Sequence, residues 1–199
     1  MLSKPKFGLP PEVKYCVKCN VINQRPTSTN EYTHDKSSKQ IPIDFDENNI
    51  CYACKSVDKK WSGEIDWKER EKELIDLCDQ YRNFKGPYNC IVGGSGGKDS
   101  SFQSHILKYK YGMRPLTVTW APHIYTDVGW NNHRRWIDIG GFDNYLFTPN
   151  GKTHSNLTKI AFENLCNPFQ PFIIGQKLLM IRLAKQLQHL CVAVAVFTR

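Results

Sequence analysis

The sequence predicts an α/β fold, with a parallel sheet and an N-terminal zinc-binding module. Two observations carry this prediction. Beyond residue 87, short apolar segments alternate with helical ones, which is typical of parallel strands covered on both faces by helices. Residues 1–60 are instead polar and rich in turn formers, and they contain two Cys-x2-Cys pairs. We therefore expect a metal module over 1–60, a connecting helix over 61–87 and an α/β domain over 88–199.

The connecting helix is expected to begin near Asp66, where apolar residues start to recur at three- and four-residue steps. Asp66 and Glu69 resemble a capping box, and Gly86 with Pro87 ends the segment. Downstream, β-branched and aromatic runs predict strands at 88–92, 116–120, 144–148 and 192–197. Helical periodicity predicts helices at 102–111, 130–139, 155–165 and 175–188.

Composition narrows the range of ligands. The 199 residues carry 27 Lys and Arg against 19 Asp and Glu, a net charge of +8, which favours an anionic ligand such as a nucleotide. The longest apolar run, 190–197, is too short to span a bilayer, and the N-terminus lacks the apolar stretch of a signal peptide. We therefore expect a cytoplasmic protein without a membrane partner.

The most informative segment is the glycine-rich turn GGSGGKDS, residues 93–100, after the first expected strand. It is neither a Walker A loop nor a dinucleotide fingerprint, because Asp99 stands where those motifs need Ser/Thr or glycine. Its glycines still let the backbone approach a phosphate, and the start of the following helix attracts anions. Lys98 adds a mobile positive charge, and Asp99 is expected to cap the helix or bind Mg²⁺. The alternative is a merely flexible turn.

The hexapeptide SGGKDS resembles the signature of the ATP pyrophosphatase (PP-loop) superfamily, with its adenine nucleotide alpha hydrolase-like sheet. Members adenylylate a substrate and release pyrophosphate. The resemblance implies that the loop holds the ATP phosphates and that Lys98 and Asp99 are catalytic. It also places Thr119 and Trp120 near the adenine, with ordinary strand residues as the alternative. The implied phosphate-binding residues are Ser95, Gly96, Gly97, Lys98, Asp99 and Ser100.

Four cysteines have the Cys-x2-Cys…Cys-x2-Cys spacing of a tetrahedral metal site: Cys16, Cys19, Cys51 and Cys54. A closed site of four thiolates has no open position, so zinc here would be structural and would order the polar segment around it. An iron–sulfur cluster and four unrelated free thiols are the alternatives. The other cysteines are expected to be small core residues. They are Cys78, Cys90, Cys166 and Cys191.

A longer series of motifs, over about residues 9–186, resembles the N-acetyl sugar amidotransferase family. The series is Tyr15-Cys16, Arg25-Pro26, the second cysteine pair, IDWKER at 65–70, SGGKDS at 95–100, KYKYG at 108–112, VTWAPHIYTD at 118–127 and FQPF at 169–172. The family converts a sugar acetamido group, on pseudaminic-acid-type or related diamino sugars, to an acetamidino group. Its products serve bacterial surface polysaccharides, such as the O-antigen of lipopolysaccharide, and flagellin glycans.

The family resemblance also implies the ligands and partners. It implies ATP, Mg²⁺ and structural Zn²⁺, with an acetamido sugar or nucleotide-sugar as the acceptor. It implies a separate glutaminase that supplies ammonia, with subunits similar to those of imidazole glycerol phosphate synthase. Nucleic acid is not an expected partner on this interpretation.

Four residues after the second expected strand are candidates for the acceptor site, at the sheet edge where such folds bind ligands. We expect them to contact the sugar or its carboxylate, with a purely structural loop as the alternative. His123 as a lone general base is a further hypothesis. The four are His123, Tyr125, Thr126 and Asp127.

Two rival functions stay open at this point. A tRNA-modifying sulfur transferase can pair a cysteine metal module with this loop, although the segment TPNG at 148–151 lacks a catalytic cysteine and Cys166 stands alone. The other rival is an inactive ATP-binding fragment. The resemblance fades near Lys185, and family members are longer. We therefore expect a C-terminally shortened chain that turns over poorly alone and self-associates or needs a partner at an uncovered sheet edge.

Overall fold

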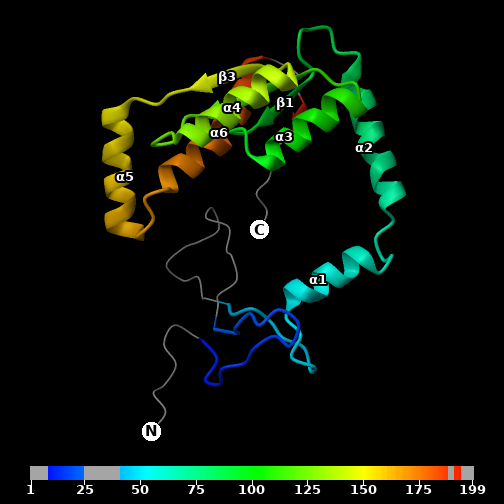
Figure 1. Ribbon diagram of the computed structural model, residues 1–199, viewed down its shortest axis with the longest axis vertical. Coiled ribbons are helices and arrows are strands. Elements are labelled where there is room, and N and C mark those ends of the chain that lie inside the picture. The colour runs from blue at the N-terminus through cyan, green and yellow to red at the C-terminus, as the bar shows by residue number, and fades with distance from the viewer. Residues whose placement is uncertain (1–8, 25–40, 188–190, 194–199) are drawn as a thin grey trace. The chain divides into compact units, whose positions relative to one another are not determined.

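The computed structural model describes residues 9–24, 41–187 and 191–193 (Figure 1). The chain divides into two compact units between Arg70 and Glu71. We call the part up to Arg70 the cysteine unit and the part from Glu71 the α/β unit. No described helix combines the length and the apolarity that a membrane-crossing segment needs.

The cysteine unit is built from two short cysteine turns and one helix. Isolated antiparallel bridges pair Tyr15 with Ile22 and Phe45 with Cys51. Helix α1 (Tyr52–Trp61) then begins at Cys51, whose Sγ accepts a hydrogen bond from the N–H of Cys54. The polar, turn-rich composition of residues 1–60 did not indicate this helix. Its start is set by a sulfur cap from Cys51 rather than by an apolar repeat.

Helix α2 (Trp67–Arg82) confirms the helix predicted to begin near Asp66. The Asp66 carboxylate accepts hydrogen bonds from the N–H groups of Lys68 and Glu69, at 3.0 and 3.1 Å, and so caps the first turn. Farther along α2, Cys78 packs with Cys90 and Met113 of the α/β unit in a small buried cluster. The expectation that Cys78 and Cys90 are core residues is therefore confirmed.

The α/β unit contains a four-stranded parallel sheet, which confirms the predicted fold class. The strand order is β3-β2-β1-β4. Parallel pairing places the carboxyl ends of the strands along one edge, so the loops that leave β1, β2 and β3 meet there. The strands are β1 (Cys90–Gly93), β2 (Pro115–Trp120), β3 (Asp143–Phe147) and β4 (Cys191–Ala193). The remainder of the fourth predicted strand, 194–197, lies outside the described residues, as do the side-chain surroundings of Cys191.

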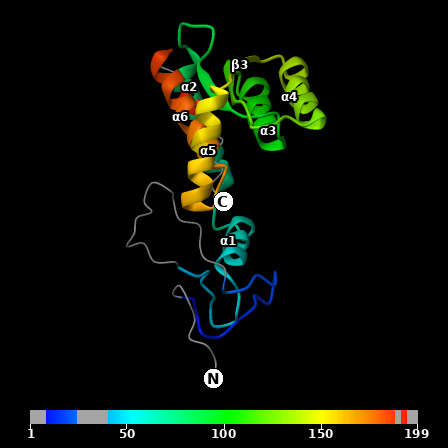
Figure 2. The same cartoon turned by 90° about the vertical axis from the view of Figure 1, so that its left-hand side faces the viewer.

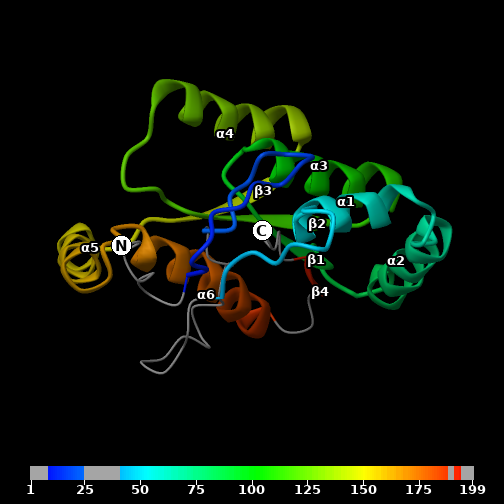
Figure 3. The same ribbon diagram turned by 90° about the horizontal axis from the view of Figure 1, so that it is seen from below.

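Helices cover both faces of this sheet, as Figure 2 and Figure 3 show, with α3 and α4 on one face and α6 on the other. The face under α6 holds the largest apolar cluster, in which Leu179, Met180 and Leu183 pack on Ile91, Leu116 and Val118. On the opposite face, the indole N–H of Trp136 donates to Ser104 Oγ at 2.8 Å and joins α4 to α3. The helices are α3 (Lys98–His105), the π-helix η2 (Ile106–Lys110), α4 (Asp127–Gly140), α5 (Gly151–Leu165) and α6 (Gln170–Gln186).

Helix α5 ends at Cys166, which adopts a left-handed conformation with φ 51°. Its thiol is exposed, so the expectation that Cys166 is a core residue is wrong. The reason is positional, because the apolar pattern of α5 stops one residue earlier and the C-cap turns toward solvent.

Candidate functional site

The glycine-rich loop lies at the carboxyl end of β1, between β1 and α3. It leaves the sheet at Gly94, whose N–H donates to Val118 O of β2 at 2.9 Å. Gly97 is the N-cap of α3 and makes no side-chain cap bond. The first turn of α3 therefore directs its N–H groups toward the loop without a side-chain cap. Asp99 does not cap the helix, which corrects one of its two expected roles; it lies exposed in the first turn.

Two glycines are required by close packing on the inner side of the loop. A Cβ at Gly94 would lie 2.3 Å from Ser100 Cβ. Gly96 has φ +82°, and a Cβ there would lie 2.6 Å from the Cα of His133 in α4. A Cβ at Gly97 would meet nothing within 4 Å. The loop is thus fixed against α4 on one side and open at Gly97, where a ligand could approach the backbone closely.

The polar side chains of the loop fall into two groups. Ser95, Lys98 and Asp99 are exposed. Ser100 is buried, and its hydroxyl donates to Gly97 O at 3.0 Å. The proton of Ser100 therefore helps to shape the loop, whereas Lys98 is free to reach an anion at the open side.

The end of β2 carries the residues expected near the adenine. Thr119 is 1% exposed, and its Oγ1 contacts His133 Nε2 at 3.2 Å and accepts from Asn144 Nδ2 at 3.1 Å. Trp120 packs on Phe147 with ring centroids 4.8 Å apart. Because the Thr119 side chain is enclosed by protein groups, a base at this edge would meet the β2 backbone or Trp120. The adenine role of these residues stays a prediction.

His133 is a residue that sequence reasoning missed. It is 3% exposed, stacks on Trp130 at 5.5 Å and lies under Gly96. Burial lowers its pKa below the usual histidine range. His133 connects the glycine-rich loop to β2. The sequence signal that could have identified it is a tryptophan three residues before it and another three residues after it.

The candidate acceptor residues separate in the structure. His123 lines a pocket of about 310 Å³ beyond the ends of β2 and β3, near the start of α5. Tyr125 instead packs edge-to-face on Trp130, at 4.9 Å, and Thr126 caps α4 through Gly129 N. Asp127 lies in the first turn of α4. The structure therefore groups Tyr125 and Asp127 with α4 and not with the His123 pocket. The other histidine of that pocket, His154, was not selected from its sequence context.

The four cysteines of the cysteine unit converge, with all their Sγ atoms within 4.8 Å of one another. Cys16 and Cys54 Sγ are 3.8 Å apart, and Cys19 and Cys51 Sγ are 3.6 Å apart. Tetrahedral zinc with Zn–S bonds of about 2.3 Å requires sulfurs about 3.8 Å apart. The cluster therefore has the donor set and spacing to hold a metal ion, as the paired spacing predicts.

Protonation in this cluster is uneven. Burial raises the pKa of the Cys16 thiol, but backbone N–H groups, that of Cys51 first, lower it overall to about 6. The pKa of Cys54 rises to about 12 because its thiol hydrogen-bonds Cys19 and is partly buried. The four thiols share their protons through hydrogen bonds, and a cation could replace these protons and bind all four sulfurs. Metal binding therefore fits the chemistry of the four thiols.

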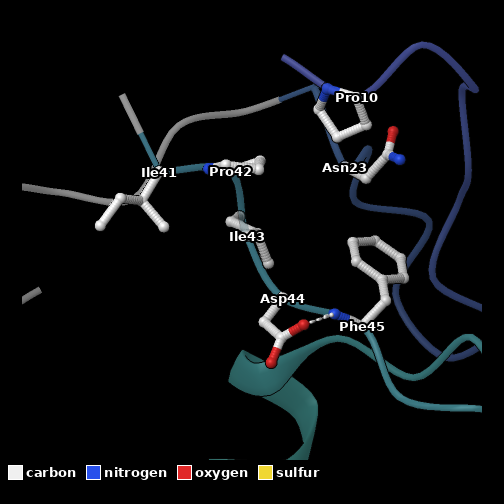
Figure 4. A pocket seen from close by; sticks show the side chains of 7 residues that line it. All are labelled: Pro10, Asn23, Ile41, Pro42, Ile43, Asp44 and Phe45. Atoms are coloured by element: carbon white, nitrogen blue, oxygen red, sulfur yellow. Dashed lines mark hydrogen bonds between the residues drawn. The ribbon is translucent and has the colours of Figure 1, made fainter. Parts of the chain in front are cut away.

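The cysteine unit also has a pocket of about 430 Å³, which the four cysteines do not line (Figure 4). Its polar groups are satisfied within the unit. Asn23 accepts from Lys14 N and donates to Glu12 O, and the Asp44 carboxylate accepts from Phe45 N. The remaining lining is mostly apolar and gives no reactive group. Its residues are Pro10, Asn23, Ile41, Pro42, Ile43, Asp44 and Phe45.

Comparison with known proteins gives partial likenesses. No protein-family model matches the chain. An uncharacterised protein of Methanocaldococcus jannaschii is 31% identical over 85 residues, which are 43% of this chain and 29% of that protein. The chain thus spans less than a third of this relative in the match.

Solved structures with a similar fold include two synthetases and a tRNA enzyme. An NH3-dependent NAD synthetase from Campylobacter jejuni has 13% identity and a TM-score of 0.44, and the match covers 64% of this chain and 56% of that one. An NMN synthetase from Francisella tularensis has 20% identity and a TM-score of 0.42, over 63% of this chain and 52% of that one. The U34-tRNA thiolase of Methanococcus maripaludis with its [4Fe-4S] cluster has 16% identity and a TM-score of 0.43, over 90% of this chain and 53% of that one. The matches span about half the length of each of these proteins. At these TM-scores they assign neither a substrate nor an activity to this chain.

Proposed function

We propose that this chain belongs to an ATP-dependent amidotransferase that converts an acetamido group of a sugar to an acetamidino group. The amide oxygen attacks the α-phosphorus of ATP, and pyrophosphate leaves. Ammonia then adds to the carbon of the O-adenylyl imidate, and AMP departs with the former amide oxygen. The product would serve bacterial surface polysaccharide or flagellin glycan synthesis.

The observation that carries the proposal is the loop between β1 and α3. It has an uncapped helix start, an open backbone at Gly97 and an exposed Lys98. This arrangement suits the pyrophosphate of ATP, because N–H dipoles and one lysine can neutralise its charge as it departs. Asp99 is the loop residue that could hold Mg²⁺, which would supply further charge neutralisation. The motif series of the N-acetyl sugar amidotransferase family supports the acceptor.

The remaining components follow from the same interpretation. Ammonia would come from a partner glutaminase with a synthase-like companion. The four cysteines would hold a structural zinc, because a closed set of four thiolates leaves no position for a substrate. The cysteine unit would therefore serve folding or docking, and the chemistry would take place at the edge of the sheet.

The rival, sulfur transfer to tRNA, needs a reactive cysteine near the loop. Cys166 lies at the far end of α5 from the sheet edge, 15 residues or roughly 22 Å along the helix axis. A gel-shift titration with tRNA over a salt series separates the two functions. Tight binding with a steep salt dependence would favour the rival.

The direct test is pyrophosphate release in a single turnover, with the chain in excess over ATP. An acetamido sugar and ammonium should together stimulate release. Lys98→Ala should weaken ATP binding roughly 10- to 100-fold, because a charged contact to phosphate is lost. Lys72→Ala, an exposed lysine of α2, is the matched control and should bind ATP normally. Normal ATP binding by Lys98→Ala would contradict the assignment of the loop.

A further inference from the structure

We propose that the pocket lined by His123 and His154 binds an anionic group, a carboxylate or a phosphate, of the acceptor. That this ligand is the acceptor rests on the proposed function; the anion site itself rests on the geometry below. The pocket lies beside the glycine-rich loop along the same edge of the sheet. Gly94 N bonds to Val118 O of β2, and Ala121 N bonds to Phe147 O of β3, so the two sites are one strand apart.

The lining of the pocket consists of hydrogen-bond donors and a few apolar groups. Two imidazoles and three hydroxyl groups face it, and no carboxylate is among the described residues that form it. The imidazoles and the hydroxyl groups of Thr148 and Ser155 can offer protons to a ligand, whereas the Thr158 hydroxyl gives its proton to His154 O. No group in this wall repels a negative charge. The lining residues are Ala121, Pro122, His123, Thr148, Pro149, Gly151, His154, Ser155 and Thr158.

His154 is the residue that most needs a ligand. It lines the pocket but is only 8% exposed, and its Nε2 is buried without a hydrogen-bond partner among the described residues. Buried polar side-chain atoms are almost always paired, so an orphaned imidazole nitrogen in a pocket wall indicates a missing partner. Trp120 packs nearby, with ring centroids 6.2 Å apart, and keeps this wall apolar on its inner side.

The hydrogen bonds around His123 determine which of its ring nitrogens carries the proton. Thr158 Oγ1 donates to His154 O at 2.8 Å, so the same oxygen can only accept from His123 Nε2, 3.2 Å away. His123 therefore carries its proton on Nε2 and keeps Nδ1 for another partner. The two imidazole rings lie 4.6 Å apart. At that distance, one bound anion can lie within reach of both rings.

The start of α5 adds a third source of attraction. The Asn150 side chain accepts from Thr153 N, and Asn150 O accepts from His154 N. In the described structure, the N–H groups of Gly151 and Lys152 have no such partner, and Gly151 lines the pocket. An uncapped pair of N–H groups at the positive end of a 15-residue helix favours an anion.

The test is a titration of the whole chain with inorganic phosphate and, separately, with acetate, read from the ring nitrogen signals of its histidines by NMR. It is done in the Lys98→Ala background, which removes the phosphate binding expected at the loop. Saturable changes at His123 and His154 are expected. The anion that binds more tightly names the group: phosphate for a nucleotide-sugar, acetate for a sugar acid.

Substitutions locate the site. His154→Gln and His123→Gln should each weaken the anion about tenfold, because a charged donor is lost. His105→Gln, an exposed histidine of α3, should bind it as before. Should His154→Gln fail to fold, His123→Gln carries the test, since its side chain is exposed. Absence of any saturable change, or equal binding by His123→Gln, would overturn the proposal. Pyrophosphate release is measured in a separate experiment, so failure of the amidotransferase proposal can be distinguished from failure of the anion site.

Discussion

Different interactions stabilise each of the two units of this protein. In the described part of the cysteine unit, residues 9–24 and 41–70, the buried side chains are Cys16, Asn23 and Cys51. The α/β unit instead buries aliphatic side chains such as Ile91 and Val92 between sheet and helices. A segment with so little apolar burial must be ordered by another interaction, and the four converging thiols are the candidate. The two units should therefore respond to opposite perturbations.

Metal removal should have the largest effect and should act on the cysteine unit. Structural zinc sites contribute about 10–16 kcal/mol of apparent binding energy that is also folding energy. A strong chelator should therefore abolish amide-exchange protection around Cys16 and Cys51 while β1 and β2 stay protected. Cys16→Ser should lose the metal, and Cys166→Ser, an exposed thiol outside the cluster, should keep it. Retention of protection in metal-free protein would contradict this view.

Truncation in the sheet should show the reverse pattern. Ile91 is fully buried in β1, so Ile91→Ala removes packing and leaves a cavity, at a cost of about 2–5 kcal/mol in the free energy of unfolding. Chemical denaturation followed by tryptophan fluorescence measures this loss. Metal content should stay the same as in the parent. A simultaneous loss of metal would mean that the two units do not have separate cores.

A smaller effect should distinguish the two sides of the phosphate loop. Gly96→Ala forces a side chain into a left-handed position against the His133 backbone, at a cost of about 1–3 kcal/mol, and should impair ATP binding. Gly97→Ala has ordinary φ and free space and should keep both stability and loop shape. Calorimetric titration with ATP compares the pair. Equal effects of the two substitutions would argue against the loop geometry described above.

The smallest expected effect is a loss of stability at acidic pH. Burial lowers the pKa of His133 below its usual value of 6.5, so the unfolded chain takes up a proton that the folded chain does not. The α/β unit should therefore lose stability as the pH falls from 7 towards 5. His133→Gln should be less stable at pH 7 and should show a shallower decline. The exposed His105→Gln should keep the parent slope, measured by urea denaturation at each pH.

Sequence patterns predicted the elements whose periodicity is set by burial. The runs around β1 and β2 were identified because their residues fill the core, and the cysteine cluster because two-residue spacing suits one metal. The run at β3 was identified by its aromatic residues, although its side chains are exposed or half-buried. Helix α3 starts at Lys98, four residues before the expected 102, because its polar first turn is fixed by the loop and not by an apolar stripe. His154 gave no local signal either, since its partners come from a loop 31 residues earlier. Tertiary contacts, rather than spacing, define that pocket.

In the proposed reaction ATP activates the oxygen of an acetamido group, and an isotope experiment can follow that oxygen. A sugar labelled with ¹⁸O in its acetamide oxygen is mixed with ATP, ammonium and excess protein, and the AMP is examined by mass spectrometry. Transfer through an O-adenylyl imidate predicts one ¹⁸O in AMP and an acetamidino sugar without it. Unlabelled AMP, or no AMP when ATP and sugar are both bound, would rule out this reaction.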